Sequence, residues 1–81
     1  RQNKSEITVL YSYAYLRDWL HLEKQLREIG YISGIATNAV GSGKVQFTIT
    51  YIGNFDKLLE ALRNKYYNLK NVGDFYIIER I

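Results

Sequence analysis

Apolar and polar residues alternate along two segments of the chain, as expected for half-buried β-strands. In residues 6–13 the odd positions from Ile7 to Tyr13 are apolar, and Leu10 breaks the alternation. Residues 44–52 alternate most clearly, with an apolar side chain at every odd position from 45 to 51. Each of these strands is therefore expected to bury one face and to expose the other.

Two other segments repeat apolar residues at steps of three and four, which predicts amphipathic helices. The first covers residues 14–29, where Leu16 and Leu20 widen the apolar stripe. The second begins at Asn54, a favourable N-cap residue, and its stripe extends as far as Leu69. We expect both helices to pack one face against the strands.

Two weaker strands, in residues 31–40 and 75–81, complete the pattern. A tight turn at residues 41–43 joins the first of them to the strand at 44–52 as a hairpin. The order strand, helix, strand, strand, helix, strand predicts an α+β fold, the ferredoxin-like βαββαβ sandwich. Its sheet has four antiparallel strands in the order 4-1-3-2, and right-handed crossovers place both helices on one face.

The two periodicities also predict which side chains form the core. The expected core residues are Ile7, Val9, Tyr11, Trp19, Leu22, Leu26, Val45, Phe47, Ile49, Leu58 and Leu62. We predict a single domain over residues 6–81, preceded by a linker stub at residues 1–5. Because the chain contains no Met, we expect it to be a domain excised from a longer protein.

Composition argues against enzymatic activity. A chain of 81 residues needs nearly all its large apolar side chains for one core, which leaves little room for a catalytic cavity. It has no Cys, which excludes thiolate zinc sites, and its one histidine, His21, lies off the apolar helix stripe. We therefore expect no catalytic residues, no metal and no cofactor. No window approaches the apolar length of a membrane span, so no transmembrane segment is expected.

The spacing of the elements carries a resemblance to a known class of small domain. The first helix ends in Ile29-Gly30, and Tyr51-Ile52-Gly53 leads from a strand into the second helix. In these features the chain resembles small ferredoxin-like domains of uncharacterised bacterial cell-envelope proteins, over residues 6–70. The resemblance implies a non-enzymatic protein-interaction or assembly module, with the cell envelope or periplasm favoured over the cytoplasm.

The sheet face away from the helices is the expected binding surface. If Phe75 and Ile77 face the core, Tyr76 and Ile78 face outward, because alternate residues of a strand take opposite sides. Leu10, on the neighbouring strand, points outward by the same rule. We expect Leu10, Tyr76 and Ile78 to form an apolar patch that contacts a protein partner, a neighbouring domain or a second copy.

Two other functions stay open. The formal net charge is +3, and Arg63, Lys65 and Lys70 near the end of the second helix are the densest basic group. They are the candidate contacts for a nucleic acid, although the scatter of the other basic residues disfavours that function. The second alternative is a small-molecule-sensing regulatory domain of the same topology.

Overall fold

The structure is a computed structural model that describes residues 3–81. Its elements follow in the order β1 (Lys4–Ser12), α1 (Leu16–Arg27), β2 (Ile32–Gly41), β3 (Lys44–Ile52), α2 (Phe55–Asn64), β4 (Tyr67–Asn71) and β5 (Tyr76–Arg80). β1 begins two residues before the expected strand, and residues 1–2 of the expected linker lie outside the described residues. Asn54 caps α2 as predicted, because its side-chain oxygen accepts a 2.9 Å hydrogen bond from the Lys57 backbone N–H.

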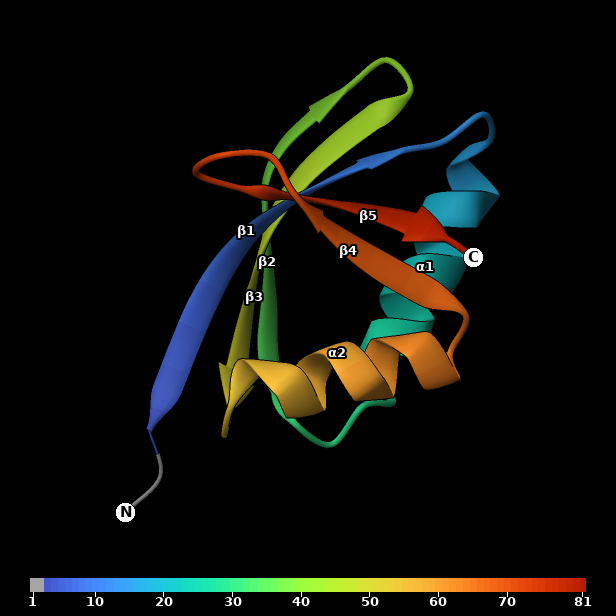
Figure 1. Ribbon diagram of the computed structural model, residues 1–81. Helices are drawn as coiled ribbons and strands as arrows, with labels where there is room; N and C mark the ends of the chain where they lie inside the picture. The colour runs from blue at the N-terminus through green and yellow to red at the C-terminus, as the bar shows by residue number, and fades with distance from the viewer. Residues whose placement is uncertain (1–2) are drawn as a thin grey trace.

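The strands form one mixed five-stranded sheet in the order β2-β3-β1-β5-β4. β1 pairs antiparallel with β3 and parallel with β5, while β2 with β3 and β4 with β5 form antiparallel hairpins. The expectation of a four-stranded antiparallel ferredoxin-like sheet of order 4-1-3-2 is therefore wrong. Both helices contribute to one core on the same side of the sheet, and the described chain leaves the opposite face open (Figure 1).

The additional strand arises because the second helix ends earlier than its apolar stripe predicts. α2 ends at Asn64, and Tyr66 then adopts a left-handed backbone conformation with φ of 69°. The chain continues as β4, which buries Tyr67 and Leu69. The expected continuation of the helix to Leu69 is therefore wrong. Tyr67 and Leu69 are two positions apart, so a strand buries both on one face, and their apolar character does not require a helix.

A tight turn between β4 and β5 adds one more reversal of the chain. The Asn71 side-chain oxygen accepts a 3.0 Å hydrogen bond from the Gly73 backbone N–H, and Gly73 has φ of 90°. Glycine adopts this conformation at little cost, since it has no Cβ. β5 therefore returns between β4 and β1 and runs parallel to β1 instead of antiparallel to it.

β5 presents the opposite face from the one expected. Ile78 is 1% exposed in the core and Tyr76 packs against that core, so the expected outward orientation of both is wrong. Pairing with β4 explains the phase, because Ile78 lies opposite buried Leu69 and Ile77 lies opposite Lys70. Burying Ile77 in this register would carry the Lys70 ammonium toward the core, at a large desolvation cost.

The core prediction is confirmed for nine of its eleven residues, which are buried, while Ile7 and Tyr11 are partly buried and pack against them. At its centre the rings of Trp19 from α1 and Phe47 from β3 lie 4.9 Å apart between centroids. The core also includes residues that the expected list omits, namely Ile29, Tyr51, Tyr67, Leu69 and Ile78. The nine confirmed residues show that the buried faces of β1, α1, β3 and α2 were assigned correctly.

Candidate functional site

The residues expected to form an apolar patch on the open face do not come together. Leu10 is half-buried there and lies opposite Ile77, whereas Ile78 is in the core. Tyr76 lies on the helix side, where its ring centroid is 5.3 Å from that of Phe55. On the open face, Leu10 and Ile77 therefore form only a small apolar patch where β1 and β5 meet. Polar residues flank it, because Gln46 lies opposite Leu10 and Lys70 lies opposite Ile77.

The basic residues expected as nucleic-acid contacts lie on different sides of the molecule. Arg63 is exposed in the last turn of α2, and Lys65 donates a 2.8 Å hydrogen bond from its ammonium to the Glu28 carboxylate. Lys70 points to the open face, because its neighbour Leu69 is buried on the helix side. No single face therefore gathers the three cations.

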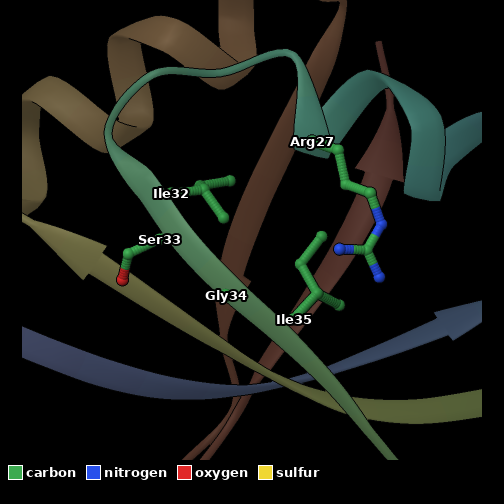
Figure 2. A pocket seen from close by; sticks show the side chains of 5 residues that line it. All are labelled: Arg27, Ile32, Ser33, Gly34 and Ile35. Atoms are coloured by element: carbon green, nitrogen blue, oxygen red, sulfur yellow. The ribbon is translucent and has the colours of Figure 1, made fainter.

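Residues for metal or small-molecule chemistry are sparse in the described chain. His21 is exposed on α1, and residues 3–81 contain no group of three His, Asp or Glu side chains able to hold a metal ion. No helix within residues 3–81 is long and apolar enough to cross a membrane. A pocket of about 220 Å³ lies between the end of α1 and the start of β2, and Arg27, Ile32, Ser33, Gly34 and Ile35 line it (Figure 2).

This pocket borders a sheet edge that carries no charge. β2 is an edge strand of ten residues, and it contains neither a charged residue nor a proline. Most of its residues are exposed, including Val40 at 63%. The other edge strand, β4, has only five residues and carries Lys70. Natural sheets usually protect their edges with charges, prolines or very short strands, so the β2 edge stands out as available for pairing.

The hairpin register identifies which backbone groups of β2 are free. The pair Gly41 and Lys44 closes a two-residue turn and is therefore hydrogen-bonded, and pairs alternate from there along the ladder. Counting through the bulges at residues 33 and 38, Ile35, Thr37 and Val40 point their N–H and C=O groups away from β3. Asn38 fixes the second bulge, since its side-chain amide donates a 2.8 Å hydrogen bond to the Thr48 hydroxyl.

One flank of α1 lies along the same edge. Leu16, Leu20, Glu23 and Arg27 share this flank because they follow one another at steps of three and four. Glu23 and Arg27 are joined by a 3.0 Å ion pair, and the Arg27 side chain extends over Ile35 of β2 (Figure 2). The flank therefore faces the side of the molecule on which β2 is unpaired.

The two leucines of this flank are exposed. Leu16 is 57% and Leu20 is 53% exposed, so the expectation that they widen the core stripe is wrong. They lie on α1 away from its buried residues Trp19, Leu22 and Leu26, where the described chain leaves them largely uncovered. Because α1 runs opposite to β2, Leu16 and Leu20 lie toward the Val40 end of the strand, whereas Arg27 lies at its Ile32 end. We call the free backbone of Ile35, Thr37 and Val40, together with Leu16, Leu20, Glu23 and Arg27, the edge surface.

One ion pair holds the end of α1 that supports this surface. The Glu28 carboxylate accepts the hydrogen bond of Lys65, the C-cap residue that follows α2. This hydrogen bond and the positive charge of Lys65 lower the pKa of Glu28 below its ordinary value of 4.5. The pair joins the C-terminal ends of the two helices.

Comparisons of this chain with protein-family models, with curated proteins and with solved structures find no match. The resemblance to envelope domains therefore stays a prediction. Sequence reasoning missed the edge surface even though the expected strand order already placed residues 31–40 at an edge. The signal that could have found it is the absence of any charge between Tyr31 and Lys44, in a chain that is 23% charged overall.

Proposed function

We propose that this chain is a non-enzymatic protein-interaction module that takes an extended polypeptide segment as an additional strand beside β2. The observation that supports the proposal is the combination of a long, uncharged free edge with an exposed leucine flank beside it. Strand addition is a common mode of peptide recognition in which main-chain hydrogen bonds supply affinity and flanking side chains supply specificity.

Each part of the edge surface has a place in such a complex. The outward N–H and C=O groups of Ile35, Thr37 and Val40 would pair with the added strand, each hydrogen bond contributing about 1 kcal/mol net. Side chains of the added strand on the helix side would cover Leu16 and Leu20, which are otherwise solvated. Burying these two side chains on binding contributes about 25 cal/mol for each Å² of apolar area removed from water.

The alternatives have less support. A nucleic-acid interface needs cations gathered on one face, whereas Lys65 is paired with Glu28 and Lys70 lies across the sheet from Arg63. A small-molecule site typically has 300–1,000 Å³ of concave volume. The pocket beside Arg27 has about 220 Å³ and is open to solvent.

Selection from a random peptide library tests the proposal without knowledge of the natural partner. Random twelve-residue peptides displayed on phage would be selected on the domain at low surface density. We expect the selected peptides to alternate apolar and polar residues and to shift the backbone amide resonances of Ile35, Thr37 and Val40.

Thr37→Pro is the variant that tests the edge directly. The Thr37 N–H points outward, so a proline at this position removes a free donor and leaves the pairing with β3 intact. We expect the selected peptides to lose at least tenfold in affinity for this variant while its melting temperature stays close to that of the wild type. Peptides that bind Thr37→Pro equally well, or that shift resonances of Leu10 and Ile77 instead, would show that the edge is not the binding surface.

A further inference from the structure

We propose that the strand added beside β2 is β2 of a second copy of this chain, paired antiparallel about a two-fold axis at Ala36. The inference rests on the proposed function, since it requires the same free edge, and it specifies the partner and the register. The product is a dimer with one continuous sheet through both copies. Such an isologous contact uses the same surface twice and therefore closes on itself.

The strand is suited to pairing with itself. β2 has no charged residue, so antiparallel self-pairing places no like charges opposite each other in any register. Its uninterrupted part lies between the bulges at residues 33 and 38, and Ala36 is close to the middle of that part. A two-fold axis at Ala36 brings the free backbone of Ile35 opposite that of Thr37 in the second copy, and the reverse.

The small side chain at the axis also fits. Ala36 directs its own N–H and C=O toward β3, so the pair of Ala36 residues across the axis is not hydrogen-bonded. Residues in such pairs approach most closely, with Cα atoms about 4.5 Å apart. Ala36 is exposed on the open face, where a methyl group permits this approach.

Charge on the helix flank points to the same axis. From the Ile32 end of β2, the Arg27 side chain extends toward Ile35, so its charged group lies near the level of Ile35 (Figure 2). The Cα atom of Glu23 lies four residues farther along α1, about 6 Å, which corresponds to about two residues of strand. Its backbone is therefore near the level of Thr37, while its carboxylate pairs with Arg27 of the same copy. The axis that exchanges Ile35 with Thr37 thus brings Arg27 opposite Glu23 of the second copy. Two such cross pairs form, one on each side of the axis.

The two-fold axis also brings the exposed Leu20 close to the second copy. Leu20 lies one turn beyond Glu23, so the axis carries it toward the start of β2 in the second copy. Tyr31, which precedes that strand, is 42% exposed. A contact between Leu20 and this ring would remove from water two side chains that the single chain leaves solvated.

Single cysteines test the axis directly, because the chain has no cysteine of its own. The variants are Ala36→Cys and, as the matched control, Ala39→Cys, which is also exposed on β2. A Cα separation of about 4.5 Å lies within the range of a disulfide, whereas Ala39 is opposite residue 33 in the proposed register. With oxidised glutathione we expect Ala36→Cys to form a covalent dimer at least tenfold faster than Ala39→Cys.

Charge exchange tests the helix contact. In Arg27→Glu each cross pair becomes repulsive. We therefore expect the affinity between the two copies, measured by sedimentation equilibrium, to fall about tenfold. Exchanging both residues, Glu23→Arg with Arg27→Glu, restores opposite charges and should return the affinity to within about threefold of the wild type.

A wild-type chain that stays monomeric at millimolar concentration, or equal cross-linking of the two cysteine variants, would overturn the second copy as partner. The proposed function would then still be tested separately, because peptide selection and its loss in Thr37→Pro do not require a dimer. If those peptides also fail to depend on Thr37, both proposals are wrong.

Discussion

The isoleucine pair in β5 allows a sharp test of the strand phase. Ile77 and Ile78 are the same residue type at adjacent positions, but Ile78 is 1% exposed in the core and Ile77 is only partly buried, on the open face. Truncating each to alanine removes the same groups. We expect Ile78→Ala to be strongly destabilising and Ile77→Ala to have a clearly smaller effect.

The size of the effect follows from burial. The carbon atoms lost from Ile78 account for about 2.4 kcal/mol, at about 0.8 kcal/mol for each buried methyl or methylene group. The cavity left beside Leu69 raises the expected loss to about 3–4 kcal/mol. A domain of 81 residues has a stability of about 4–12 kcal/mol, so this change removes a large part of it. Ile77→Ala should cost less, about 1–2 kcal/mol, since Ile77 is only partly buried and no helix covers the open face.

Urea denaturation followed by far-UV circular dichroism measures both variants. Fluorescence of Trp19, the only tryptophan and only 6% exposed, supplies a second probe of the same transition. If the dependence of the unfolding free energy on urea concentration (the m value) equals that of the wild type, the difference in urea midpoint reports a difference in stability. If Ile77→Ala lost more stability than Ile78→Ala, the assignment of β5 faces given above would be wrong.

Two further changes probe the end of α2 and its ion pair. Tyr66→Gly should raise the free energy of unfolding measured in urea by about 0.5–1 kcal/mol, because the Tyr66 backbone is left-handed at φ 69° and its side chain is 66% exposed. The control is Tyr31→Gly, which should give no gain because Tyr31 does not have a positive φ. Because the pKa of Glu28 is lowered on folding, its contribution is complete above pH 4.5 and is lost as pH falls through the lower folded value. The difference in urea midpoint between wild type and Glu28→Gln should therefore be constant above pH 4.5 and shrink below it; a difference that grows on acidification would contradict this assignment.

Local patterns were sufficient for most of the chain because each element there has one strong period. The alternation around Phe47 and the helical stripe through Trp19 and Leu22 identify the faces that the structure buries. The same patterns failed between Asn64 and Ile81. There Tyr66 and Leu69 continue the helix stripe, whereas Tyr67 and Leu69 share one face of a strand, and no glycine or proline marks the end of the helix.

The candidate site shows a different limit. The sequence contains the signal of an uncharged strand in residues 32–41, but exposure of its edge depends on what packs beside it. Leu16 and Leu20 look like core residues by spacing, yet they are exposed, because α1 turns Trp19, Leu22 and Leu26 toward the core instead. Spacing shows which residues share a flank, and only the packed arrangement shows whether another element covers that flank.

Periodicity and residues close together along the chain were enough to predict the two helices, the β2–β3 hairpin and nine of the fourteen buried residues of the described core. The tertiary structure decided the number of strands, the parallel pairing of β1 with β5 and the face of Ile78. These features depend on contacts between residues far apart in sequence. A strand whose two faces are similarly apolar, such as residues 75–81, receives its orientation from its neighbours, here Leu69 on the buried side and Lys70 on the open side.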